Sequence, residues 1–180
     1  FLDMTETIHS YDSPYEAALQ LKNQIRDKLG FTVNIGVAPN KLLAKMASDF
    51  EKPDKVHTLF LEEVPKKMWP LPVKDLFLVG KATQKKLYLL GIQTIGELAR
   101  MDLKMLQAHV GRKYGQTLYN YARGIDTSPV EAEESLNKGY GNSTTLAKDI
   151  DTLEEADHVL ISLSEMVASR LRRVPGIGMT

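Results

Sequence analysis

The sequence predicts an α+β fold in which helices and short strands flank an all-helical centre. Residues 31–39, FTVNIGVAP, alternate in hydrophobicity and lie between two amphipathic segments of helical periodicity. Residues 71–123 divide into short helical segments that glycines separate. Beyond them, an extended segment precedes a long amphipathic helix. Because only the first and last of these patterns contain strands, separate domains are expected.

The composition is ordinary for a globular protein and excludes several kinds of site. The 180 residues are 43% hydrophobic and include no cysteine. Disulfides, thiolate zinc sites and cysteine nucleophiles are therefore excluded, and a reducing cytosol is favoured. No apolar run is long enough to cross a bilayer, and the opening FLDMTETIHS does not resemble a signal peptide. The chain does not begin with methionine, so we expect a piece of a longer protein.

The N-terminal third predicts a β-α-β-α unit, which begins with a short strand at residues 1–8 and a helix at residues 14–29. Ser13 is the expected N-cap of that helix, Glu16 completes a capping box, and Gly30 ends the helix. A half-buried strand is expected next, at residues 31–37. The small residues on its second face are expected to allow another group to approach closely, and they are Thr32, Asn34 and Gly36.

A second helix is predicted for residues 41–52, with Asn40 as its N-cap and Pro53 after its end. Its apolar stripe consists of Leu42, Leu43, Met46, Ala47 and Phe50. Lys41 and Lys45 lie one turn apart on the opposite side, and Lys52 returns near the same face at the helix end. Residues 55–61 are expected to form a further strand.

Two glycine turns characterise the helical centre, which follows the proline-rich boundary VPKKMWPLPVKDL. The sequence Leu78-Val79-Gly80-Lys81 is expected to join two helices, and His109-Val110-Gly111-Arg112-Lys113 repeats the pattern 31 residues later. Such helix-hairpin-helix turns direct backbone N–H groups of the second helix outward, where they can bind a phosphate oxygen. Lys81, Lys85 and Lys86 add mobile positive charge.

The alternative is an αα-hairpin whose glycine only ends a helix. The charge distribution favours phosphate binding, because residues 71–123 contain nine Lys and Arg against three Asp and Glu, a net charge of +6. Residues 124–160 have a net charge of −7, so the neutral total conceals a basic centre. Two turns within a basic segment make backbone binding the better interpretation.

The C-terminal part begins with an acidic linker and continues with a predicted strand in NKGYGNSTTLAKD. A long helix follows, for which Thr152 and Glu155 form a capping box. Its expected buried stripe comprises Ala156, Val159, Leu160, Leu163 and Val167. A strand followed by a helix predicts the start of another α+β domain.

Several of these motifs, in this order, resemble the Y-family translesion DNA polymerases of the UmuC-like and DinB-like group. NIGVAPNKLLAKMASDFEKPD is similar to the family's late-palm motif, and LPVKDLFLVGKATQKKLYLLGIQTIGELA resembles its thumb hairpin. LYNYARGID resembles the end of the thumb. GNSTTL resembles the first strand of the little finger and favours the Gram-positive UmuC-like members.

The resemblance implies four regions and the activity of a longer parent. Residues 1–62 would be the C-terminal part of the palm, 63–127 the thumb, 128–136 a linker, and 137–180 the start of the little-finger domain. The family transfers nucleotides with two Mg²⁺ ions held by palm carboxylates. Those carboxylates lie upstream of the FLDMT stretch, so no catalytic or metal-binding residue is expected in this chain, and the chain alone is expected to bind DNA without polymerising. Asp3 is expected to be a structural hydrogen-bond acceptor.

The resemblance also implies roles for particular residues. Lys52 matches the lysine that contacts the triphosphate of the incoming nucleotide, with Lys41 and Lys45 as further candidates. The residues implied to bind the DNA backbone are Val79, Gly80, Lys81, Lys85, Gly111, Arg112 and Lys113. Candidates for template contacts are Tyr140, Asn142, Ser143 and Thr144, although a plain edge strand would explain these four equally well. Many relatives have Pro-Gly-Ile-Gly at the thumb hairpin, where this chain has Phe-Leu-Val-Gly.

The implied partners are primer-template DNA, a deoxynucleoside triphosphate and, through a C-terminal region outside this chain, the sliding clamp. The implied location is the bacterial cytoplasm, at the nucleoid during activity. Two alternatives are a non-enzymatic helix-hairpin-helix DNA-binding module and a protein-interaction domain with an incidental basic face. A hydrolase is disfavoured because the four histidines are scattered and no P-loop is present.

Overall fold

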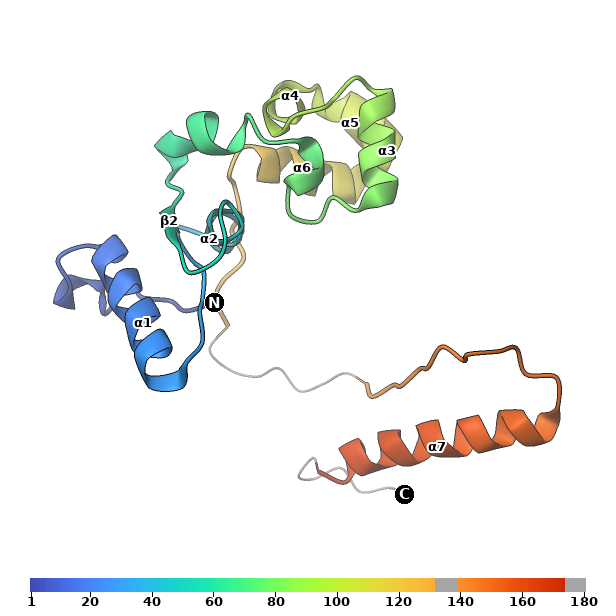
Figure 1. Ribbon diagram of the computed structural model, residues 1–180. Coiled ribbons are helices and arrows are strands. Elements are labelled where there is room, and N and C mark those ends of the chain that lie inside the picture. The colour runs from blue at the N-terminus through green and yellow to red at the C-terminus, as the bar shows by residue number, and fades with distance from the viewer. Residues whose placement is uncertain (132–138, 174–180) are drawn as a thin grey trace. The chain divides into compact units, whose positions relative to one another are not determined.

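The computed structural model describes residues 1–131 and 139–173. The chain divides into two compact units, Phe1–Val130 and Glu131–Thr180. The first unit contains a two-stranded sheet with helices α1 and α2 and a group of helices, α3 to α6 (Figure 1). The described part of the second unit contains one long helix, α7. The mixed α+β class is confirmed.

Helix α1, Pro14–Leu29, begins after Ser13 and ends at Gly30, as these two residues predict. The Ser13 hydroxyl accepts a hydrogen bond from the Glu16 N–H at 3.1 Å. Gly30 ends the helix in the left-handed conformation at φ 71°, where a residue without Cβ has little strain. The side chains that α1 buries belong to Ala17, Ala18 and Lys22. The buried lysine marks the side of α1 on which an anionic partner must lie.

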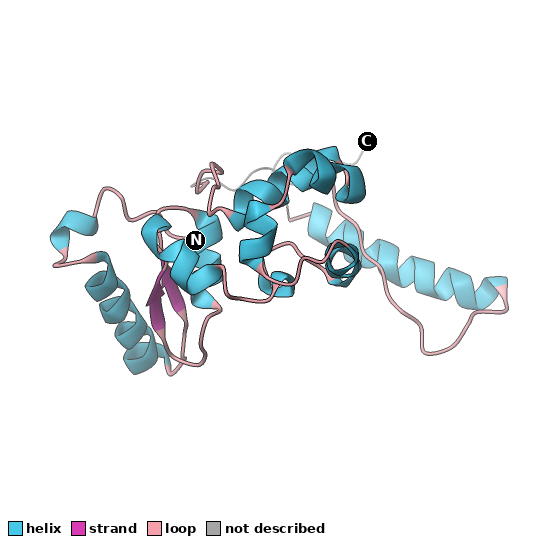
Figure 2. Cartoon of the chain, turned by 90° about the horizontal axis from the view of Figure 1, so that it is seen from above, coloured by secondary structure: helices cyan, strands magenta, loops and turns pink. Residues whose placement is uncertain are grey.

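The sheet pairs β1, Ile35–Val37, with β2, Val56–Thr58, in parallel (Figure 2). Helix α2, Lys41–Ser48, forms the connection between them, so the three elements make a βαβ unit. The expected close approach to Gly36 is made by α2 itself. A Cβ on Gly36 would lie only 1.9 Å from the Ala44 carbonyl oxygen.

The strand predicted for residues 1–8 is wrong. The Asp3 carboxylate accepts hydrogen bonds from the Thr5 N–H at 3.0 Å and the Thr5 hydroxyl at 2.6 Å, which turns the backbone out of an extended conformation. A short 3₁₀ helix, Ile8–Ser10, follows. The described unit is therefore α1-β1-α2-β2, without the leading strand.

Helix α2 has the predicted N-terminus but a different end. Asn40 caps it by accepting a hydrogen bond from the Leu43 N–H at 2.9 Å. The helix ends at Ser48 with Asp49 as C-cap, so Lys52 lies in the following loop and not at the helix end. The reason is that the Asp49 N–H turns back to the carbonyls of Met46 and Ala47, which closes the last turn early.

The helical group follows three short helical turns, Leu61–Glu63, Val64–Met68 and Val73–Asp75. Its helices are α3, Lys81–Leu89; α4, Ile95–Arg100; α5, Leu103–Val110; and α6, Arg112–Ala122. The second predicted hairpin is α5-Gly111-α6, as expected. The first differs, because the element before Gly80 is only the 3₁₀ turn Val73–Asp75 and not an α-helix.

A single hydrophobic core joins the sheet and the helical group. It includes Leu43 from α2, Leu59 after β2 and Leu118 from α6, all fully buried. The Trp69 indole N–H donates to the Ala122 carbonyl at 2.9 Å, which fixes the end of α6 against the segment before α3. Because both regions share buried side chains, this unit behaves as one packed body.

In the second unit, α7 spans Leu153–Leu171, and Thr152 caps it by accepting from the Glu155 N–H at 3.3 Å. The predicted strand in residues 137–149 begins outside the described residues, and no strand forms in residues 139–149. The buried stripe of α7 is also wrong, since none of its side chains is buried and Leu160 is 59% exposed. The described part of this unit contains neither a pairing strand nor a second helix to cover that face.

Most of the linker predicted for 128–136 lies outside the described residues. Among the helices that the structure describes, none is both long enough and apolar enough to span a membrane.

Candidate nucleic-acid and nucleotide interface

Helices α3 and α6 begin differently from the other α-helices of the described chain. Each starts directly after a glycine, Gly80 or Gly111, and neither N-terminus has a side-chain cap. The other described α-helices are each capped by a side chain, from Ser13, Asn40, Thr94, Asp102 and Thr152. The first-turn N–H groups of α3 and α6 therefore remain available to an external acceptor, and they carry the positive end of the helix dipole.

Tyr114 links these two helix N-termini. Its hydroxyl donates to the Leu78 carbonyl at 2.6 Å and accepts from the Thr83 hydroxyl at 3.3 Å. Thr83 lies in the first turn of α3 and Tyr114 in the first turn of α6. The two uncapped ends are consequently neighbours, although their glycines are 31 residues apart in the sequence.

The cations at these helix ends differ from Lys22, Lys45 and Lys52, which are each paired with an aspartate. Within the described ranges, no ion pair involves the exposed Lys81, Lys85, Lys86, Arg112 or Lys113. Arg112 and Lys113 also border a hollow of about 410 Å³. Positive charge without an internal partner is suited to an external polyanion. Val79, in contrast, is half-buried and packs against the core.

The turn before α3 has an unusual backbone. Leu78 adopts φ 75°, whereas Gly80, the residue expected to need such freedom, has φ −82°. The Val79 N–H donates to the Leu76 carbonyl at 3.0 Å, which closes a four-residue turn with Phe77 and Leu78 at its centre. A positive φ at the third position is typical of a type II turn, which favours proline followed by glycine at the centre. Here Phe77 and Leu78 occupy these two central positions, so the turn forms without proline or glycine.

The lysines predicted to contact a triphosphate divide into two groups. Asp49 binds both Lys45, at 2.6 Å, and Lys52, at 2.7 Å, through its two carboxylate oxygens. Hydrogen bonds from Lys45 and then Lys52 hold the pKa of Asp49 below its usual value, against the opposing effect of burial. Lys41 lies apart, with its ammonium 5.9 Å from the centre of the Phe1 ring.

Two side chains hold the N-terminus of α2. Asn40 accepts from the Leu43 N–H and donates to the Gly124 carbonyl at 2.9 Å, while Asp126 accepts from the Leu42 N–H at 3.1 Å. Burial would raise the pKa of Asp126, but hydrogen bonds from Ser128 and Leu42, together with the charge of Lys41, lower it overall. The hydrogen bonds of Asn40 and Asp126 therefore join α2 to the segment that follows α6.

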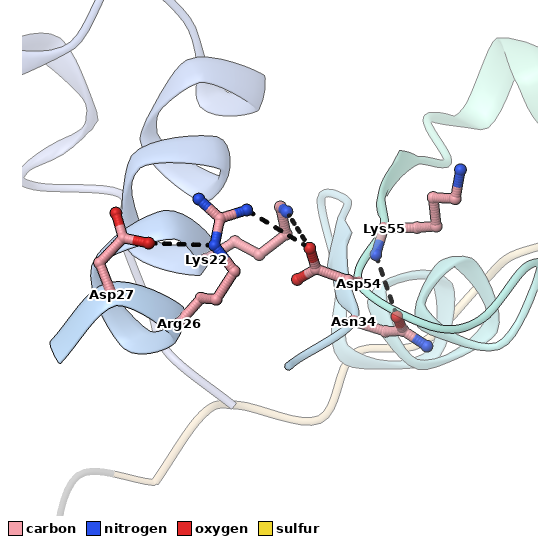
Figure 3. A network of polar contacts seen from close by, with 6 residues as sticks. All are labelled: Lys22, Arg26, Asp27, Asn34, Asp54 and Lys55. Atoms are coloured by element: carbon pink, nitrogen blue, oxygen red, sulfur yellow. Dashed lines mark hydrogen bonds and ion pairs between the residues drawn. The ribbon is translucent and has the colours of Figure 1, made fainter. Parts of the chain in front are cut away.

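The loop that carries Lys52 is held by a network that the sequence interpretation missed (Figure 3). Asp54 pairs with the buried Lys22 of α1 at 2.8 Å and with Arg26 at 3.6 Å. The next residue, Lys55, donates its backbone N–H to the Asn34 side chain at 3.1 Å. The sequence does indicate that Lys22 is buried, because Lys22 lies four residues after Ala18 and therefore on the buried side of α1.

The candidate template-contact residues lie in the second unit. The Asn142 amide donates to the Met166 sulfur at 3.2 Å, and the Asn142 carbonyl oxygen accepts from the Ser143 N–H at 3.1 Å. Thr144 is exposed, whereas Tyr140 is half-buried. Asn142 is therefore used to hold its segment against α7.

No group of three or more His, Asp or Glu side chains suited to a metal ion occurs among the residues that the structure describes. The described residues therefore do not supply the ligand set of a catalytic metal.

Three models of protein domains match successive regions of the chain. A model of the impB/mucB/samB family matches residues 1–49, and that family's C-terminal domain matches residues 137–178. Together these two matches cover just over half of the chain. The chain belongs to the impB/mucB/samB family. The thumb domain of DNA polymerase-iota matches residues 74–126, the region that contains both glycine turns.

Relatives of this family chain agree with that assignment. It is 44% identical to DNA polymerase IV of Clostridium acetobutylicum over 96% of this chain and 43% of the relative. It is 42% identical to DNA polymerase IV of Moorella thermoacetica, over the whole chain and 45% of the relative. For DNA polymerase IV 1 of Bacillus subtilis the identity is 42%, over 96% of this chain and 42% of the relative. The chain thus spans less than half the length of these relatives, and the prediction of a Y-family chain is confirmed.

Proposed function

We propose that this chain is the DNA-holding part of a Y-family DNA-directed DNA polymerase that extends primers across damaged template. In this proposal residues 1–62 are the end of the palm, 63–127 the thumb, 128–136 a linker and 137–180 the start of the little finger. Nucleotidyl transfer with Mg²⁺ belongs to the complete parent, and the family membership supports this assignment.

The observation that carries the proposal is the pair of neighbouring, uncapped helix N-termini at Gly80 and Gly111. Two such ends can each bind one phosphate oxygen with backbone N–H groups, and the unpaired cations nearby add charge. Backbone contacts of this kind fix a protein on a duplex without selecting a sequence. A polymerase that moves along any template needs this property.

The first test is the salt dependence of DNA binding by the Lys81→Ala/Lys85→Ala variant. We expect the slope of log affinity against log salt to fall by about 2, because each lost phosphate contact removes roughly one unit. The measurement is fluorescence anisotropy with a primer-template duplex between low and physiological salt. The control variant Lys28→Ala/Lys66→Ala removes the same charge from exposed positions elsewhere and should keep the slope. An unchanged slope in the first variant would exclude the turn as a phosphate-binding site.

We further propose that Lys52, assisted by Lys45, binds the triphosphate of the incoming nucleotide. Asp49 neutralises both ammonium groups in the structure described here, so a triphosphate would replace it as their anionic partner. Lys41 is a further candidate. The template contacts proposed for Tyr140, Asn142, Ser143 and Thr144 follow the family resemblance alone, as does a sliding-clamp contact outside this chain.

The Lys52→Ala variant of the complete parent polymerase tests this role. We expect KM for a deoxynucleoside triphosphate to rise roughly tenfold, since a charge-assisted contact is lost, while primer-template affinity stays the same. Single-nucleotide insertion over a range of nucleotide concentrations gives KM directly. Lys55→Ala is the matched control, because Lys55 is similarly exposed and pairs with Glu51 instead. An equal effect in both variants would mean that general charge, and not this lysine, governs nucleotide binding.

A further inference from the structure

Leu78 occupies a backbone conformation that its side chain disfavours. Its φ of 75° lies in the left-handed region, where the Cβ of an L-residue approaches the neighbouring carbonyl oxygen. Glycine is the usual residue at this position of such a turn. Strain of this kind persists only where surrounding contacts impose it, and it is concentrated at functional sites.

Three hydrogen bonds impose the conformation. The Val79 N–H donates to the Leu76 carbonyl at 3.0 Å, and the Gly80 N–H donates to the Leu78 carbonyl at 3.1 Å. The same Leu78 carbonyl accepts from the Tyr114 hydroxyl at 2.6 Å, so the turn is fastened to α6. The side chain of Leu78 is consequently presented from a fixed backbone.

The Leu78 side chain is not needed to fill the core. It is 49% exposed, and its neighbour Phe77 is 40% exposed with its ring stacked on Tyr121 at 6.4 Å between ring centres. Directly after this apolar pair come Gly80 and the uncapped start of α3, followed by the unpaired Lys81. The turn therefore presents an apolar side chain next to a phosphate-binding helix end.

We propose that Leu78 contacts the deoxyribose of the nucleotide whose phosphate binds at the start of α3. This inference rests on the proposed DNA-binding function. The deoxyribose is the apolar part of the DNA backbone and lies next to each phosphate, so it fits a leucine beside a helix N-terminus. A ribose would place its 2′-hydroxyl against the leucine and lose hydration of that group. Leu78 thereby favours a DNA backbone over an RNA backbone.

The decisive variants are Leu78→Ala and Leu78→Gly in the full chain. Leu78→Ala keeps the backbone restriction but removes most of the side chain, and we expect the affinity for duplex DNA to fall roughly fivefold. The salt slope should stay unchanged, because no counterion is released by an apolar contact. Leu78→Gly should lose the same affinity while the thermal midpoint stays equal to the parent's or rises, since the strain is relieved. Leu89→Ala, which removes an 88% exposed leucine from the far end of α3, is the control for lost apolar surface.

Discrimination is measured with DNA duplexes that contain scattered ribonucleotides. The unmodified chain should bind them less tightly than the all-DNA duplex, and Leu78→Ala should reduce this difference. Unchanged DNA affinity of Leu78→Ala would overturn the inference, as would a loss accompanied by a lower salt slope. The outcomes remain separable from those of the proposed function. If Lys81→Ala/Lys85→Ala lowers the salt slope while Leu78→Ala binds DNA with normal affinity, only the proposed leucine contact is wrong. If Lys81→Ala/Lys85→Ala keeps the salt slope, the proposed phosphate-binding site is wrong.

Discussion

Replacing Gly36 with alanine should destabilise the first unit by about 3 kcal/mol or more. Gly36 lies in β1 directly against α2, and a Cβ there would be 1.9 Å from the Ala44 carbonyl oxygen and 2.7 Å from the Ser48 nitrogen. Both atoms belong to the helix backbone, so no side-chain rotation can relieve the overlap. Helix α2 would have to move away from the sheet, and it carries Leu42 and Leu43 into the core.

Urea-induced unfolding, followed by far-UV circular dichroism, measures this loss. Gly80→Ala is the matched control, because Gly80 has an ordinary φ of −82° and a Cβ there meets no atom within 4 Å. We expect Gly80→Ala to change the free energy of unfolding by less than about 1 kcal/mol. If Gly36→Ala were as mild as its control, the tight packing of α2 on β1 would be wrong.

Asn40→Asp should cost about 2 kcal/mol, although aspartate and asparagine are usually equivalent as N-caps. The Asn40 carbonyl oxygen accepts from the Leu43 N–H, and its amide donates to the buried Gly124 carbonyl at 2.9 Å. A carboxylate can make the first bond but not the second. It would also leave the Gly124 carbonyl unpaired and face it with negative charge, beside the Asp126 carboxylate that binds the Leu42 N–H.

Ser13→Asp provides the comparison for this prediction, because Ser13 only caps α1 through the Glu16 N–H. We expect that change to be within about 0.5 kcal/mol of the parent, since Ser and Asp are similar caps. Both free energies come from urea unfolding at neutral pH, where the new carboxylates are ionised. Equal stability of Asn40→Asp and the parent would show that the bond to Gly124 does not help to join the sheet to the helical group.

Gly36 and Asn40 give a structural reason for two positions of the motif that resembles the late palm. In NIGVAPNKLLAKMASDFEKPD, position 36 requires glycine, because any Cβ there would overlap the backbone of α2. Asn40 has both a donor and an acceptor, which its two partners require. Both positions therefore support the shape of the fold that carries the candidate nucleotide-binding lysines.

Local sequence patterns predicted the features that depend on nearby residues. The caps at Ser13, Asn40 and Thr152 were found because a cap involves a side chain and an N–H only three residues away. The glycine turns at Gly80 and Gly111 were found for the same reason. The DNA-binding roles of the basic residues around them stay predictions.

Tertiary contacts decided the features that the sequence alone did not reveal. Lys22 is buried because the carboxylate of Asp54, 32 residues later, neutralises its ammonium group.

The helix-hairpin turn depends on distant contacts in the same way. Leu78, and not a glycine, takes the left-handed conformation because Tyr114 holds its carbonyl from 36 residues away. Caps and periodicity are properties of a few consecutive residues and can be found in any sequence. Pairings, burial and imposed backbone strain depend on partners that only folding brings together.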